Sequence, residues 1–163
     1  MIDRDGIRLL ILSIAGEFEL DPQLVSAVVL QESGGRPFAM RYEQAFFIRY
    51  VRDVPIDQMK GFIPDPRLVS LATERSLRAH SFGLMQMMGQ VAREFGFKRL
   101  DLGDLLDPTI NLKLGCHILR FHIEKQGSVE KGLVRWNGSE RYAHEVMARI
   151  DSGESNAYLR PSS

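Results

Sequence analysis

The sequence has very little cysteine and no excess of charge of either sign. Cys116 is the only cysteine among 163 residues, which excludes an intrachain disulfide, and its place in an apolar helical run predicts a small buried side chain. The four histidines show no ligand spacing, so we expect no metal site. The 21 basic and 21 acidic residues balance, whereas dedicated nucleic-acid-binding proteins normally carry a clustered basic excess. We therefore expect no cofactor and no nucleic-acid partner.

Long apolar runs are also lacking. No stretch reaches the roughly 18 apolar residues of a membrane-spanning helix. The apolar run at residues 7–15 is preceded by Asp3 and Asp5, where a signal peptide needs positive charge, and no small-x-small cleavage site follows. Its positions 7, 10, 11 and 14 share one stripe of a helix, so we predict a first amphipathic helix and no signal peptide.

Strand-like alternation and internal repeats are absent too, and helical periodicity dominates the chain. We predict a single, almost all-α domain over residues 1–150, with at most a minimal β element, and a polar, loosely held tail over 151–163. Three prolines and Gly61 make residues 54–66 mostly loop. The expected helices after the first cover residues 22–33, 43–53, 67–78, 89–95, 108–126, 128–136 and 139–150.

Glu32 lies at the end of an expected helix that begins with Asp21 as N-cap and Pro22 at the first position. By helical spacing its carboxyl group shares a face with the valines at positions 25, 28 and 29. Burial and the negative end of the helix both raise the pKa of such a group, which can then donate a proton near neutral pH. The alternative is an ion pair with Arg36 or Arg41, and this segment alone leaves both interpretations open.

Four segments resemble, in the same order, the signatures of soluble-lytic-transglycosylase-like domains. They are residues 32–35 (ESGG), 83–87 (the family's GLMQ segment), 107–115 (its DPxxNixxG segment) and 136–138 (WNG, where the family has YNxG). Tyr142, Ala143 and Val146 match the closing helix of the family. The likeness covers roughly residues 20–150, and although each motif is weak alone, four in order are strong evidence.

A narrower likeness begins at residues 39–43 (AMRYE) and continues through Phe47 and Tyr50 to residues 81–83. These residues resemble a subgroup common in phages and prophages, in which RYE or RFE precedes the GLMQ segment. The insertion between Gly35 and Ser81 is longer than in the commoner family members.

The resemblance implies a lysozyme-like fold and cleavage of the MurNAc-β-1,4-GlcNAc bond of peptidoglycan. Glu32 would be the single acid/base: it protonates the leaving oxygen and then takes the proton of the MurNAc C6 hydroxyl, which closes on C1 to give a 1,6-anhydro product. The expected substrate-binding residues are Ser33, Gly83, Met85, Gln86, Trp136, Asn137 and Tyr142. Trp136 replaces the family's usual Tyr, so any contact with the acid must come from its ring N–H.

Glu43 bears on the outcome of the reaction. A hydrolytic muramidase usually needs a second carboxylate, and Glu43 is the most plausible one in this chain. The alternative, which we favour, is that Glu43 pairs with Arg41 or Arg49, or caps a helix, and so supports the site.

A competing hypothesis is a virion structural or glycan-binding protein that kept the fold and lost the activity. The retained Glu32, Gln86 and Asn137 argue against it. The expected partners are peptidoglycan strands and, beyond them, virion or secretion-apparatus proteins. We expect action on the periplasmic or extracellular cell wall, with delivery by a virion, a lysis system or a secretion system.

Overall fold

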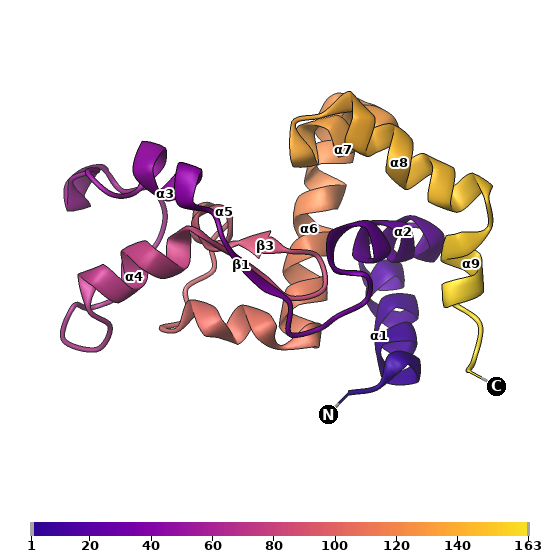
Figure 1. Ribbon diagram of the computed structural model, residues 1–163, viewed down its shortest axis with the longest axis horizontal. Helices are drawn as coiled ribbons and strands as arrows, with labels where there is room; N and C mark the ends of the chain where they lie inside the picture. Colours follow the sequence, from indigo (N-terminus) through magenta and orange to yellow (C-terminus); the bar gives the residue numbers. More distant parts are fainter. Residues whose placement is uncertain (1, 163) are drawn as a thin grey trace.

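Most of the chain is helical in the computed structural model, which describes residues 2–162 (Figure 1). The helices are α1 (Arg4–Glu17), α2 (Pro22–Ser33), α3 (Gln44–Tyr50), α4 (Leu71–Arg78), α5 (Gly89–Glu94), α6 (Pro108–Gln126), α7 (Val129–Asn137), α8 (Glu140–Asp151) and α9 (Glu154–Tyr158), with short 3-10 helices η1 (Ile56–Gln58) and η2 (Leu102–Leu106). The strands β1 (Met40–Tyr42), β2 (His80–Phe82) and β3 (Met87–Met88) form one antiparallel sheet in that order. The prediction of a mostly helical fold with a minimal β element is confirmed. No described helix is long and apolar enough to cross a membrane.

The boundaries of α2 and α6 follow from local sequence signals. Asp21 and Asp107 are the N-caps, and each side chain accepts a hydrogen bond from a backbone N–H of the first turn. At the other ends, Gly34 (φ 62°) and Gly127 (φ 77°) adopt the left-handed conformation that glycine reaches without strain. Two other helices are shorter than predicted: α3 ends at residue 50, and α4 begins only after its N-cap, Ser70.

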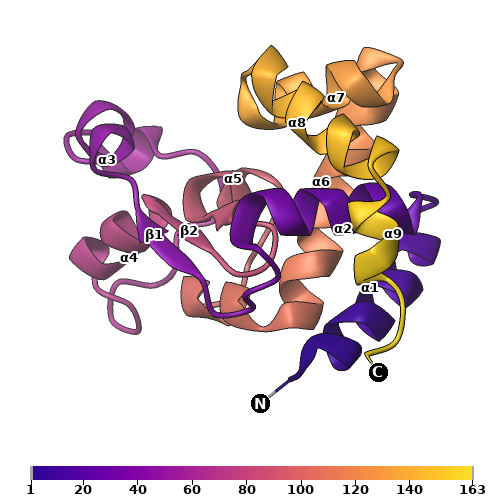
Figure 2. The ribbon, with the colours of Figure 1, turned by 45° about the vertical axis from the view of Figure 1, so that its right-hand side comes forward.

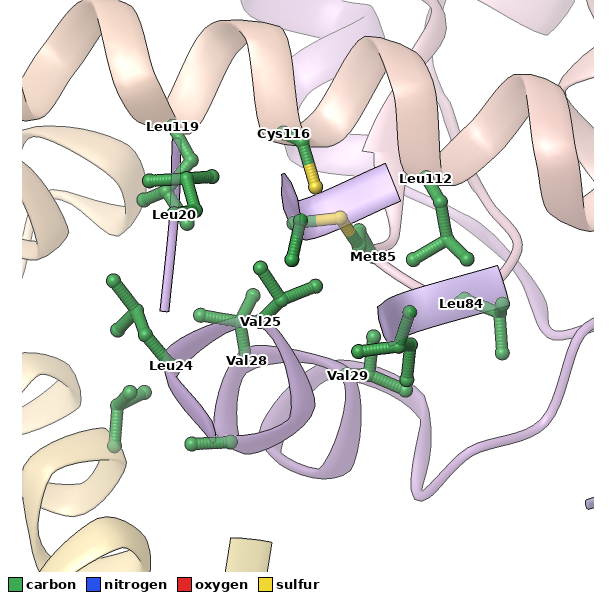
Figure 3. Close-up of a cluster of buried hydrophobic side chains, with 14 of the residues drawn as sticks. Leu20, Leu24, Val25, Val28, Val29, Leu84, Met85, Leu112, Cys116 and Leu119 are labelled. Carbon is green, nitrogen blue, oxygen red and sulfur yellow. The ribbon is translucent and has the colours of Figure 1, made fainter. Parts of the chain in front are cut away.

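The main core lies between α2 and α6 (Figure 3). Val25, Val28 and Val29 of α2 point toward α6, whose Cys116 is fully buried as predicted. Burial raises the pKa of the Cys116 thiol to about 12, so this side chain acts as a small apolar group. The core therefore fixes α2, and with it the position of Glu32 at its last turn.

The sheet, α3 and α4 lie at the opposite side of the molecule from α1, α2, α8 and α9, with α6 between them (Figure 1). A buried ion cluster holds this sheet-bearing side together: both Arg78 and Arg93 donate hydrogen bonds of 2.8 Å to Oε1 of Glu74. The same two guanidinium groups also donate to backbone carbonyls in the loops at residues 60–62 and 97–100. These contacts tie the two loops to α4 and α5, which carry the arginines.

The expectation of a loosely held C-terminal tail is wrong for residues 154–158. These residues form α9, which packs alongside α2 (Figure 2). Ser155 is fully buried, and its carbonyl oxygen accepts a hydrogen bond of 3.2 Å from the hydroxyl of Ser26. The ring of Tyr158 covers Gly35, directly after the last turn of α2. The tail thus braces the segment that carries Glu32.

Candidate active site

Glu32 lies on the wall of a cleft of about 360 Å³. The cleft is formed by residues far apart in the sequence, from the end of α2, the sheet, and helices α5, α6 and α7. Of the predicted site residues, it brings together Glu32, Gln86, Trp136 and Asn137, with Arg41 and Glu43. The core of α2 and α6 and the sheet supply the two rigid sides of the cleft, so these groups are held in fixed relative positions.

The carboxyl group of Glu32 has two hydrogen-bond donors, and both approach the same oxygen. The hydroxyl of Tyr142 donates to Oε1 at 2.7 Å, and the ring N–H of Trp136 donates to Oε1 at 3.0 Å. Oε2 has no hydrogen-bond partner among residues 2–162. When the group is protonated, the proton therefore resides on Oε2, because Oε1 already accepts two hydrogen bonds.

Neither arginine that could have neutralised Glu32 pairs with it. Arg36 donates to the carbonyl oxygen of Ser33 at 2.9 Å, and Arg41 donates to Glu43. Glu32 forms no ion pair within the described part of the chain. The interpretation of Glu32 as a simple helix-end ion pair is therefore wrong, and burial is the largest influence on its charge state.

The environment of Glu32 favours the protonated form. Burial raises the pKa of the Glu32 carboxyl above its usual value. The hydrogen bonds from Tyr142 and Trp136 and the charge of Arg41 stabilise the carboxylate and only partly offset this effect. Burial, followed by the neighbouring charge of Glu32, raises the pKa of Tyr142, which therefore stays a neutral donor. A partly buried acid with two fixed donors on one oxygen is suited to giving and then retaking a proton.

Gln86 occupies a strained turn at the edge of the cleft. Its backbone has a positive φ of 46°, and its side-chain N–H groups donate to the carbonyls of Gly83 (3.0 Å) and Ala39 (3.2 Å). The side-chain oxygen has no partner in the described residues, so it is free to accept a hydrogen bond from a ligand. The strain at this position is consistent with a conformation fixed for function.

The other residues of the 83–87 segment lie differently from the prediction. Met85 is fully buried in the core against Gly115 instead of lining the cleft, and Met87 lines it in its place. A Cβ on Gly83 would lie 2.5 Å from Nδ2 of Asn111, so this glycine serves the close approach of Asn111. Met85 therefore does not line the cleft, whereas the expected close approach of the Gly83 backbone to the saccharide stays a prediction.

Asn111 determines the shape of this turn, although it was not among the expected site residues. Its side chain donates to the carbonyls of Phe82 and Leu105 and accepts from the backbone N–H of Met85, each at 2.8 Å. Asn111 is fully buried, so all three bonds are protected from water. Asn111 is part of the 107–115 motif, so the sequence indicated its importance, but its hydrogen-bond partners could not be predicted from the sequence.

Ser33 and Tyr142 were expected to bind substrate, but neither residue lines the cleft. Ser33 is buried and donates to the carbonyl of Val29 at 3.1 Å, away from the cleft. Tyr142 is also buried and reaches the site through its hydroxyl bond to Glu32. Asn137 is exposed at the cleft and makes no hydrogen bond to the described residues.

Glu43 and Arg41 form an ion pair at the sheet side of the cleft. The guanidinium of Arg41 donates to Oε1 of Glu43 at 2.5 Å, and Ser81 donates to the same oxygen at 3.5 Å. The predicted pairing with Arg41 is confirmed. The hydrogen bond from Ser81 links this pair to the neighbouring strand β2.

Several cleft residues were not among the expected site residues. They come from α5, α6 and α7 and are Val91, Glu94, Phe95, Ile118, His122 and Arg135. No group of three His, Cys, Asp or Glu side chains suited to a metal ion occurs within residues 2–162.

Comparison with known families gives one match. The family described as the transglycosylase SLT domain matches residues 10–156, which is most of the chain and includes every cleft residue named above. Comparisons with curated proteins and with solved structures gave no match.

Proposed function

Because the chain belongs to the transglycosylase SLT family, we propose that it is a lytic transglycosylase that cleaves the MurNAc-β-1,4-GlcNAc bond with Glu32 as its single acid/base. Membership of this family implies cleavage of the glycan strands of peptidoglycan. The finer claims, namely the intramolecular reaction, the single acid and its partners, rest on the geometry of the cleft.

The first step is proton transfer from Oε2 of Glu32 to the glycosidic oxygen. The bond between MurNAc C1 and that oxygen breaks, its electron pair stays on the oxygen, and positive charge develops at C1. Tyr142 and Trp136 stabilise the carboxylate that is left behind, because both already donate to Oε1. The N-acetyl group of MurNAc can assist by sharing the charge at C1.

The second step returns the proton. The Glu32 carboxylate takes the proton of the MurNAc C6 hydroxyl, and the oxygen closes on C1 to form the 1,6-anhydro ring. No water is consumed, and Glu32 is protonated again for the next cycle. Asn137 and the side-chain oxygen of Gln86 line the same cleft and are the polar groups that we propose to hold the sugar.

One observation carries this proposal, and it concerns the carboxyl group of Glu32. Burial raises the pKa of this group, and it has no ion-pair partner in residues 2–162. Two neutral donors hold one of its oxygens. Glu43, in contrast, accepts a charged hydrogen bond from Arg41. A proton donor must be protonated at working pH, and the raised pKa of Glu32 favours this form.

A hydrolytic muramidase that uses Glu32 together with Glu43 is the second candidate. It is favoured by the presence of Glu43 on the wall of the same cleft. The ion pair with Arg41 argues against it, because a carboxylate held in such a pair is less free to activate water.

We also propose that the protein belongs to the phage and prophage subgroup, because of its RYE segment at residues 41–43, and that it acts on the cell wall outside the cytoplasm.

A zymogram on purified peptidoglycan tests the enzymatic claim. Wild type should clear the gel, Glu32→Gln should not, and Glu130→Gln, which changes an exposed carboxylate outside the cleft, should clear it like wild type. Circular dichroism of all three would establish that they are folded. Failure of the folded wild type to clear the gel would favour the binding-only protein.

A further inference from the structure

The part of the cleft formed by α5, α6 and α7 has no role in the proposed chemistry. We call it the α5–α7 wall, and it consists of Val91, Glu94, Phe95, Ile118, His122 and Arg135. It combines three apolar side chains with three polar ones. These residues line the same cleft as Glu32 and Trp136, so the wall faces the space in which the substrate would lie.

Arg135 is unusual among the arginines of the chain. Arginines elsewhere in residues 2–162 form ion pairs, donate to carbonyls or lie over aromatic rings. Within that range Arg135 and Arg160 are the two whose guanidinium groups have no such partner, and Arg135 is the one of the two that lines the cleft. All five of its N–H donors are therefore available to a ligand.

The neighbouring charges leave Arg135 as the cation of this wall. Burial, followed by the charges of Arg135 and Lys125, lowers the pKa of His122, so the imidazole is largely neutral at neutral pH. The carboxylate of Glu94 accepts a hydrogen bond of 2.8 Å from Gln90 on the same helix. No described side chain satisfies the guanidinium of Arg135, and an anion from the substrate would do so.

Peptidoglycan carries carboxylates next to small apolar groups, and this combination matches the wall. We infer that Arg135 binds a substrate carboxylate, either the lactyl carboxylate of a bare strand or a carboxylate of the peptide stem, and thereby selects the strands that the cleft accepts. A planar guanidinium can bind a carboxylate through two parallel hydrogen bonds. Val91, Phe95 and Ile118 would contact the adjoining methyl groups. The inference rests on the proposed function for the identity of the ligand.

Binding to soluble glycan strands tests the inference without turnover. All the proteins tested carry Glu32→Gln, which prevents turnover. Isothermal titration calorimetry then compares the affinity of the protein that keeps Arg135 with the affinities of Arg135→Gln and Arg135→Lys. Three strand types serve as probes: stem-bearing strands, strands stripped of stems by an amidase, and stripped strands whose lactyl carboxylates are converted to methylamides. Arg160→Gln is the matched control, since it removes the other unpartnered arginine, which lies outside the cleft.

Arg135→Gln should weaken binding about three- to tenfold to the strands that carry the recognised carboxylate, and Arg135→Lys should weaken it less. Weakening confined to stem-bearing strands assigns a stem carboxylate, and weakening on stripped strands assigns the lactyl carboxylate. Methylamide strands should bind both proteins equally. Equal affinities throughout, equal weakening on the methylamide strands, or no binding to any strand overturns the inference. A wild type that releases no anhydro ends would refute the proposed function alone, because the binding series does not need turnover.

Discussion

Trp136 donates its ring N–H to Oε1 of Glu32 at 3.0 Å, across 104 residues of sequence. Tyr142 donates to the same oxygen at 2.7 Å, so both donors converge on one side of the carboxyl group. This leaves Oε2 to carry the proton. The arrangement also separates two effects on the acid: burial raises its pKa and so favours the protonated form, and the donors stabilise the carboxylate formed during the reaction.

Tyr142→Phe should change the pH profile as well as the rate. The hydroxyl of Tyr142 lowers the pKa of Glu32, so its removal should raise that pKa further and move the alkaline limb of kcat to higher pH. Loss of one hydrogen bond to the developing carboxylate should reduce kcat by about tenfold or more. Steady-state kinetics between pH 4 and 9 measure both. Tyr158→Phe, outside the cleft, is the control, and an unshifted alkaline limb for Tyr142→Phe would refute the assigned role.

Glu32→Gln should stabilise the fold at neutral pH. The folded-state pKa of Glu32 lies above its ordinary value of 4.5, so the unfolded chain loses this proton first as pH rises. The free energy of unfolding therefore falls with rising pH until the pH passes the folded-state pKa. A glutamine at this position does not titrate, so the variant does not lose this stability. Calorimetry should give a higher Tm for Glu32→Gln at pH 7, by about 2–4 °C for each kcal/mol relieved, and similar values at pH 4. A lower Tm at pH 7 would mean that Glu32 is not destabilised by burial.

Glu43→Gln distinguishes support from catalysis. If Glu32 acts alone, Glu32→Gln should reduce turnover by at least about 10²-fold, the contribution of general acid catalysis. Glu43→Gln breaks one ion pair with an exposed arginine and should cost at most about tenfold. The measurement is the turnover rate of both variants on purified glycan strands, relative to wild type. Comparable total loss would instead favour the two-carboxylate muramidase.

Gly83→Ala should destabilise the fold more than it affects substrate binding. The new Cβ would meet Asn111 and the carbonyl of Leu105 at a residue with φ 70°. A loss of about 2–4 kcal/mol in urea unfolding is expected. Gly96→Ala is a matched control, because φ is also positive there (87°) but no atom lies within 4 Å, so about 1–2 kcal/mol should be lost. Equal losses of unfolding free energy in the two variants, together with a raised KM for Gly83→Ala, would instead support a saccharide-facing role for Gly83.

The parts of this protein that the sequence predicted correctly depend on local chemistry. The caps Asp21 and Asp107 and the terminal glycines Gly34 and Gly127 act within one helical turn, so their effect can be read from neighbouring residues. The dependence of Trp136 on its ring N–H followed from simple donor chemistry, although its geometry did not.

The parts that the sequence could not predict depend on contacts between distant segments. Met85 turns into the core because Asn111, on α6, fixes the turn before Gln86. The helix α9 is too short and polar to be recognised by periodicity, and packing on α2 stabilises it. Arg135 carries no sequence signal of its own, since only the tertiary fold brings it to the cleft.

The most direct test of the central claim is the chemistry of the new glycan ends formed in H₂¹⁸O. Digested strands, separated and weighed by mass spectrometry, should carry 1,6-anhydro-MurNAc ends without ¹⁸O, because the C6 hydroxyl and not water attacks C1. Reducing ends that contain ¹⁸O would contradict the account and identify the enzyme as a hydrolase.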